Sequence, residues 1–157
     1  MEAAWRHSPA VVRLLLQHGA HPRTERLLHS AAAASNPSFA EVHPERSDPD
    51  RVEVLQILLE AGADVNDMEP DPKGRPLRGM LSRRRTMESG TPLHAAVGAE
   101  NIRTVRFLLE HGADPQAPSW SGHSPLQVAV SHKLEDIAEL LKSWKVESAE
   151  KMSEKMS

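Results

Sequence analysis

The sequence has no cysteine and no tyrosine, and aromatic residues make up only 3% of its 157 positions. Without cysteine, disulfides, thiolate metal sites and cysteine nucleophiles are excluded. No apolar run approaches the roughly 18 residues that a membrane-spanning helix needs, and the N-terminus MEAAWRHSPA has no apolar signal-peptide core. We therefore expect a soluble intracellular protein, cytoplasmic or nuclear, without a membrane partner.

The apolar residues that are present are mostly leucine, valine and alanine, which favour helices. The length suits one domain or one short repeat array. The net charge of −3 disfavours general nucleic-acid binding, although it averages an acidic block over 41–71 and a basic block over 73–85.

Internal repetition is the strongest feature of the chain. TPLHAAVGAENIRTVRFLLEHGADP begins at Thr91, and SPLQVAVSHKLEDIAELLKSW begins at Ser124, an offset of 33 residues. The second half of this unit recurs upstream as VEVLQILLEAGADVN (52–66) and VVRLLLQHGAHP (11–22), and the first half recurs as RLLHSAAAA (26–34). The sequence therefore contains about three and a half copies of one unit.

The unit that begins at Thr91 predicts a pair of helices. The Thr91 hydroxyl can cap a first helix, and Pro92 suits the first helical position, where a missing N–H breaks no bond. A second helix is expected to begin near Asn101 and to end at Gly112, since glycine adopts the left-handed C-terminal conformation without steric cost. The expected buried residues of the second helix are Ile102, Val105, Leu108 and Leu109.

The segments GTPLHAAV and VRFLLEHGADP, together with the 33-residue offset, resemble the ankyrin repeat. The resemblance implies a mainly α fold, in which antiparallel helix pairs with projecting hairpin loops stack into an α-solenoid. It also implies a non-catalytic protein–protein interaction module, a scaffold or adaptor, that binds through its hairpin tips and the concave surface of its first helices.

The repeats predict a single array over 1–145, followed by a polar tail over 146–157 that we expect to be disordered. Two segments rich in proline, serine and charge, 35–50 and 68–89, are expected to be inserted surface loops. In the last unit, the alignment suggests that one turn residue is missing before Lys133. The expected units are about 1–22, 23–66, 90–122 and 123–145.

Candidate catalytic and metal-binding residues are weak. The nine histidines form no metal-binding frame, and His29 and His94 fall at the motif histidine, which by the resemblance bonds backbone between repeats. Asp64 and Asp114 recur with the unit, which indicates a structural role. We expect no catalytic residue, no cofactor and no metal.

Trp120 is the strongest candidate for contact with a partner, because it lies in a loop between two regular units and tryptophan is a frequent interface anchor. It could instead fold back onto an adjacent loop. Trp144 is expected to cover the open end of the last unit. We expect a monomer that binds an unidentified protein, and the candidate binding residues are Trp120, Ser121, His123, Ala95, Ala99, Val128 and His132.

The basic segment GRPLRGMLSRRRTMES supports an alternative, in which the chain binds phosphate, nucleic acid or an acidic partner. Two features oppose it: no aromatic residue is interleaved, and an acidic block adjoins it. RRRT also resembles a basic-directed kinase site at Thr86. The candidate basic residues are Lys73, Arg75, Arg78, Arg83, Arg84 and Arg85.

Overall fold

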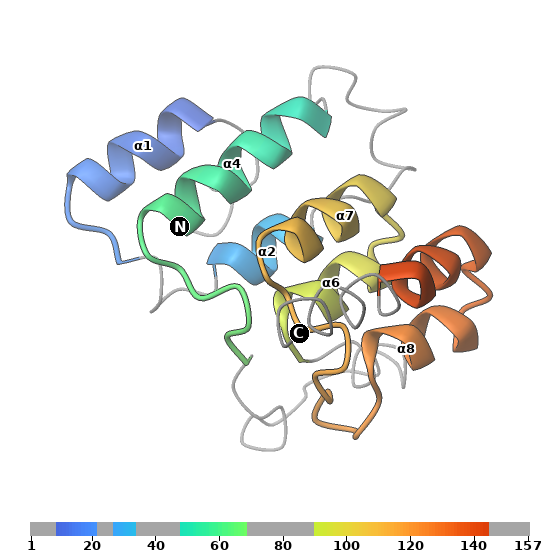
Figure 1. Cartoon of the computed structure of the whole chain (residues 1–157). Helices are drawn as coiled ribbons and strands as arrows, with labels where there is room; N and C mark the ends of the chain where they lie inside the picture. Colours follow the sequence, from blue (N-terminus) through green and yellow to red (C-terminus); the bar gives the residue numbers. More distant parts are fainter. Residues whose placement is uncertain (1–8, 22–26, 34–47, 69–89, 145–157) are drawn as a thin grey trace, which may run out of the picture.

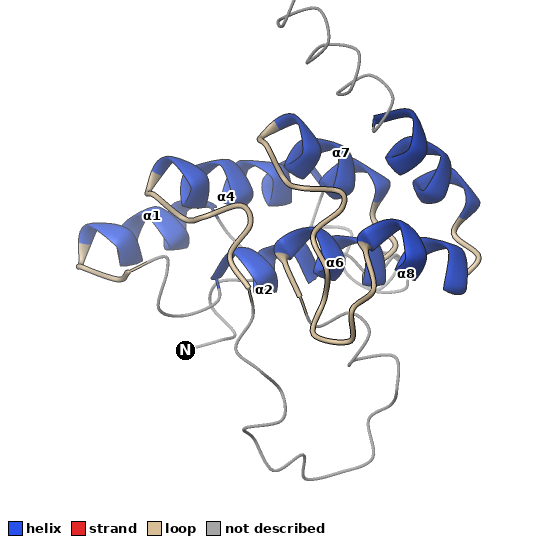
Figure 2. Ribbon diagram, turned by 60° about the horizontal axis from the view of Figure 1, so that its bottom comes forward, coloured by secondary structure: helices blue, strands red, loops and turns tan. Residues whose placement is uncertain are grey.

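A computed structural model describes residues 9–21, 27–33, 48–68 and 90–144. The described helices lie in two layers (Figures 1 and 2). One layer holds α1 (Pro9–Gln17), α4 (Asp48–Glu60), α7 (Ile102–Glu110) and a helix over 135–144. The other holds α2 (Leu27–Ala33), α6 (Pro92–Gly98) and α8 (Pro125–Ser131). No strand occurs in the described ranges.

Neighbouring helices in each layer pack on one another. In the layer of α1, α4 and α7, α1 contacts α4 and α4 contacts α7. In the layer of α2, α6 and α8, which are the first helices of their units, α2 contacts α6 and α6 contacts α8. The pairs α2–α4 and α6–α7 join the layers. This stack of helix pairs is the α-solenoid that the sequence predicted, and loops project from it beside α6 and α8 (Figure 2).

The first helices begin where the capping residues predict. Thr91 and Ser124 both have extended backbone and precede a proline in the first turn. Their backbone N–H groups are bonded by the side chain three residues on: Thr91 donates to His94 Nδ1 at 3.2 Å, and Ser124 donates to Gln127 Oε1 at 2.8 Å. These bonds satisfy donors that a helix end would otherwise leave open.

The second helix of the unit that begins at Thr91 is also capped, and the pattern of its buried residues corrects one prediction. Asn101 Oδ1 accepts the Thr104 N–H at 3.0 Å, and Val105, Leu108 and Leu109 are buried as expected. Ile102, however, is 38% exposed. It is the first residue of α7, and the buried face of that helix begins two residues later, at Thr104, and also includes Phe107.

One helix boundary and the length of one turn differ from the sequence prediction. Helix α4 begins at Asp48, so the last residues of the expected loop 35–50 are helical. No turn residue is missing before Lys133, because Glu100 and Lys133 hold equivalent left-handed conformations, with φ of 60° and 59°. The 33-residue offset therefore continues through the turn between the helices.

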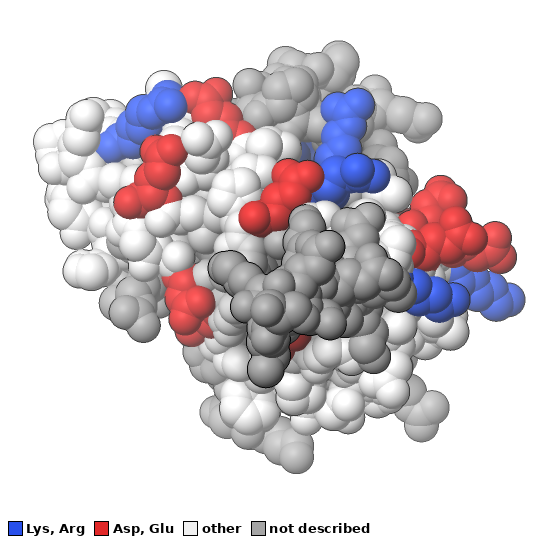
Figure 3. All heavy atoms as spheres, viewed as in Figure 1, with Lys and Arg blue, Asp and Glu red and all other residues white. Residues whose placement is uncertain are grey.

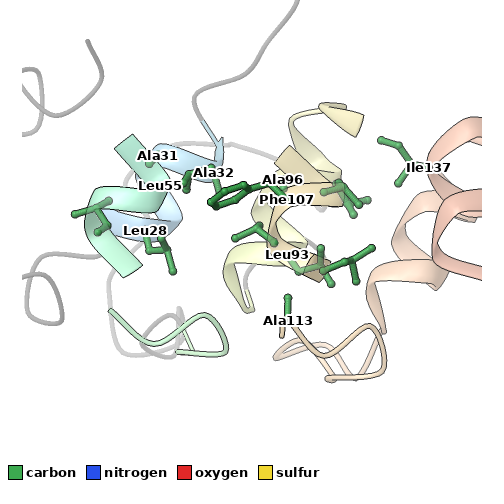
Figure 4. Packing of buried hydrophobic residues seen from close by; sticks show 14 of the residues in the cluster. Leu28, Ala31, Ala32, Leu55, Leu93, Ala96, Phe107, Ala113 and Ile137 are labelled. Atoms are coloured by element: carbon green, nitrogen blue, oxygen red, sulfur yellow. The ribbon is translucent and has the colours of Figure 1, made fainter. Parts of the chain in front are cut away.

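The core runs without a break from unit to unit, because each unit covers the next. Phe107 points from α7 toward Ala32 of α2 in the preceding unit (Figure 4) and is 8% exposed. Counting back from the glycine that ends each second helix, Leu14 holds the same position in α1, yet it is 53% exposed. No described helix packs on that side of α1, so Leu14 is exposed where Phe107 is buried.

Among the described residues, no helix combines the length and the apolar character needed to cross a membrane.

Candidate functional site

The loop before α8 ends in a tight turn that carries Trp120. The Ser119 N–H donates to the His123 carbonyl at 2.8 Å, and the Gly122 N–H donates to the Ser119 carbonyl at 2.9 Å. Gly122 has φ of 80°, a conformation that costs glycine little. Trp120, Ser121 and Gly122 therefore form a three-residue tip that these two bonds close.

Side-chain hydrogen bonds fix the shape of this tip. Ser119 Oγ lies 2.9 Å from Ser121 Oγ, and Ser121 Oγ lies 2.9 Å from His123 Nδ1. The His123 N–H donates to Ser119 Oγ at 3.2 Å. Ser119 is buried, whereas Trp120 remains 44% exposed, so the tip presents much of the indole to solvent on an ordered backbone.

The buried His94 ring anchors the tip to the core. Its Nδ1 accepts the Thr91 N–H at 3.2 Å and lies 3.0 Å from the Thr91 hydroxyl. The ring proton must therefore be on Nε2, which donates to the His123 carbonyl at 2.9 Å. Burial lowers the pKa of His94, and the positive charge that His29 can carry lowers it further, against the bond to His123. The imidazole is neutral at pH 7.

His29 makes the corresponding bond one unit earlier. Its Nε2 lies 3.0 Å from the Gly90 carbonyl, at the start of the next unit. Both motif histidines thus bond to backbone in the following unit, which confirms the structural role that the sequence predicted for them.

Asn66 joins two successive loops, and sequence analysis missed it. Its Nδ2 donates to the Gly112 carbonyl at 3.1 Å, and its Oδ1 accepts the Asp114 N–H at 2.8 Å. The carboxylates beside these bonds close local turns: Asp64 accepts the Asn66 N–H and Asp114 accepts the Gln116 N–H. The available signal was the amide side chain that follows GAD and one further residue in both units.

The predicted binding residues differ in how far they are exposed. Trp120 and Ser121 are exposed, and His123, Ala95, Ala99 and His132 are partly buried. Val128 is 0% exposed, so its inclusion in the binding surface was wrong. Its side chain lies in the core, where it packs among the apolar residues between units.

Ala99 and His132 occupy equivalent places, at the C-caps of α6 and α8, whereas the Trp120 tip lies at the N-terminal end of α8. A surface that includes all of them therefore extends along the first helices from one end to the other. Trp144 is partly buried against the core, which agrees with its expected role at the end of the last unit.

The basic candidates and the possible phosphorylation site lie in 69–89, outside the described residues. These are Lys73, Arg75, Arg78, Arg83, Arg84, Arg85 and Thr86. The predicted tail 146–157 also lies outside them. Within the described ranges, no three histidine, aspartate or glutamate side chains gather in a way that could hold a metal ion.

Comparison with known proteins places this geometry in a family. Residues 51–152 match the sequence model of the family described as Ankyrin repeats, in 3 copies. The chain is 31% identical over 120 residues to human Ankyrin repeat and SOCS box protein 6, covering 76% of this chain and 24% of that protein. It is 30% identical over 129 residues to the Mitochondrial disaggregase of Bos taurus, covering 82% of this chain and 16% of that protein.

A third similarity is to human BCL-6 corepressor-like protein 1, at 35% identity over 80 residues, which cover 50% of this chain and 4% of that protein. The chain thus matches about a quarter or less of the length of each of these relatives.

Proposed function

The chain belongs to the ankyrin repeat family, whose repeats are generally protein–protein interaction modules, and on this premise we propose that it is a non-catalytic adaptor. Its partner is a protein, and the contact surface consists of the Trp120 tip and the exposed surface of the first helices.

The observation that carries the proposal is the exposure of Trp120 on an ordered turn. Tryptophan is among the residues that contribute most to protein interfaces, because one side chain buries a large apolar area. An indole that is 44% exposed on a turn closed by backbone and side-chain hydrogen bonds offers that area with little further loss of conformational entropy on binding.

The hydrogen bonds between units support the same proposal. His94 ties the tip to α6, and Asn66 ties the loop after α4 to the loop after α7. These contacts hold successive loops in fixed positions relative to one another. A partner that touches more than one unit therefore meets a surface whose geometry is set before binding.

A matched pair of variants tests the proposal. Trp120→Ala and Leu14→Ala each remove one exposed apolar side chain, the first at the tip and the second at the far end of the array. The wild type and both variants, immobilised at equal density, are incubated with lysate of the source cells, and the bound proteins are quantified by mass spectrometry. We expect a set of proteins that the wild type and Leu14→Ala retain and that Trp120→Ala loses.

Circular dichroism of each variant checks that the helices are intact. If Trp120→Ala folds and retains the same proteins in the same amounts as the wild type, the tip is not the binding surface and the proposal fails.

A further inference from the structure

Charge is distributed unevenly over the two helix layers. Aspartate, glutamate, lysine and arginine make up 26% of the chain, yet none occurs in α2, in 90–99 or in 115–132. These segments form the described first helices and the Trp120 tip. In Figure 3 the coloured charges lie mainly over α1, α4, α7 and the 135–144 helix, whereas the surface over the loop before α8 is mostly white.

The first-helix layer offers neutral polar groups in place of charges. Ser121, Gln127 and Ser131 are exposed, and the Ser131 hydroxyl is already bonded to the Val128 carbonyl at 2.8 Å. Charged residues border these segments along the chain: Arg26 precedes α2, Glu100 follows 90–99, and Asp114 and Lys133 flank 115–132.

A charged side chain of a partner that is buried against the described first helices would lose its water and would find no opposite charge on α2, α6 or α8. Burying an unpaired charge is costly, whereas neutral hydrogen-bonding groups and apolar groups can be satisfied by hydroxyl, amide and indole groups. The lack of charge therefore selects against both acidic and basic segments, while the exposed indole favours an apolar contact.

We infer that this face binds a polypeptide segment without charged side chains, one apolar residue of which covers the Trp120 indole. The inference rests on the proposed function and adds the chemistry of the partner to it. Because no ion pair contributes to such a complex, its affinity should be nearly independent of salt.

Selection from a phage-displayed library of random twelve-residue peptides tests this chemistry without knowledge of the natural partner. The full chain is the bait, and Trp120→Ala and Leu14→Ala are selected in parallel. We expect the wild type and Leu14→Ala to enrich peptides that are depleted in acidic and basic residues relative to the input library, and Trp120→Ala to enrich none of them.

The most enriched peptide is then synthesised and its Kd measured by fluorescence anisotropy. We expect the Kd to change by less than about twofold between 50 and 500 mM NaCl. Placing one lysine at the centre of the peptide should weaken binding by about tenfold or more.

Two serines of the chain provide a matched charge test. Ser131 and Ser143 are both exposed, and each hydroxyl donates to the carbonyl three residues earlier, at 2.8 and 2.9 Å. Ser131 lies at the end of α8 on the uncharged layer, whereas Ser143 lies on the charged one. Ser131→Lys should shift the selected peptides toward acidic residues, and Ser143→Lys should leave the selection unchanged.

The outcomes distinguish the inferred chemistry of the partner from the proposed function. A Trp120-dependent pool that is rich in lysine and arginine, or in aspartate and glutamate, overturns the inferred chemistry and leaves the proposed function standing. A pool that binds Trp120→Ala equally well overturns both, as does the absence of any enrichment above the Trp120→Ala background.

Discussion

His94 and His123 are joined by a hydrogen bond of 2.9 Å from the buried ring of one to the backbone carbonyl of the other. The same carbonyl accepts the N–H of Ser119, which closes the turn that carries Trp120. A residue in the core of one unit therefore sets the position of an exposed indole in the loop that leads to the next. This coupling makes the stability of the array and the geometry of its candidate binding surface depend on the same side chain.

Replacing His94 by alanine should destabilise the protein strongly. The change leaves the buried Thr91 N–H and the His123 carbonyl without the ring that bonds them and opens a cavity in the core, and we expect a loss of about 3 kcal/mol in the free energy of unfolding. Gln127→Ala is the control, because Gln127 holds the equivalent position in the last unit but is exposed; it should cost less than about 1 kcal/mol. Urea unfolding at pH 7 measures both, and equal losses would contradict the prediction.

Stability should fall as the solution becomes acidic, with His94 as one cause. Burial lowers the pKa of His94 below its ordinary 6.5, and the neighbouring titratable groups are His29 and His123. The unfolded chain therefore takes up this proton at a higher pH than the folded chain, so the contribution of His94 is constant above about pH 6.5 and declines below it.

Urea midpoints at pH 7.5, 6.5 and 5.5 measure this decline. In His94→Gln the neutral amide replaces the titrating ring, as Gln127 does in the last unit, and the dependence on pH should flatten. His111→Gln, a change at an exposed histidine, should retain the slope of the wild type. A His94→Gln variant that loses stability with acid as steeply as the wild type would show that other groups cause the decline.

Gly90 should not tolerate alanine, because its neighbour is the His94 ring. A Cβ added at Gly90 would lie 2.7 Å from His94 Nδ1, closer than packed atoms allow, and we expect Gly90→Ala to cost about 2 kcal/mol. In the last unit the corresponding residues are His123 and Gln127, so a side chain stands in the glycine position where the ring is absent. Gly90→Ala should accordingly cost less in the His94→Gln background, which a double-mutant cycle measures; simple additivity would refute the steric explanation.

Asn66→Ala should weaken the contact between the loops that follow α4 and α7. The side chain makes two hydrogen bonds to backbone groups of the later loop, and their removal should cost about 1 to 2 kcal/mol. Gln116→Ala alters the corresponding residue of that later loop, whose side chain makes no hydrogen bond to another described residue, and should be nearly neutral. Thermal unfolding of the two variants distinguishes them, and a neutral Asn66→Ala would show that the two bonds add nothing to stability.

The sequence by itself determined the unit and its local structure. Capping by Thr91 and Ser124 and termination at Gly112 depend on backbone preferences within a few residues, and these are legible in a single repeat. The 33-residue offset then predicted how the units follow one another. The resemblance to the ankyrin repeat also assigned the two motif histidines to the scaffold before any contact was visible.

Only the tertiary structure decided what each side chain meets. Val128 is an apolar residue on a first helix and was predicted to belong to the binding surface, yet it is buried in the core. Gly90 has no unusual backbone angle, and its need for glycine comes from the imidazole beside it. Asn66 resembles Gln116 in sequence and differs in having a later loop within reach.

Leu14 and Phe107 show the reason most simply. They hold the same position in their helices, and the helical period marks both as residues of the buried face. Phe107 is covered by α2 of the preceding unit, whereas Leu14 is 53% exposed and no described helix packs on its side of α1. Helix periodicity is a property of the local chain, whereas burial depends on which neighbouring unit lies against that face, and that is set by the assembled stack.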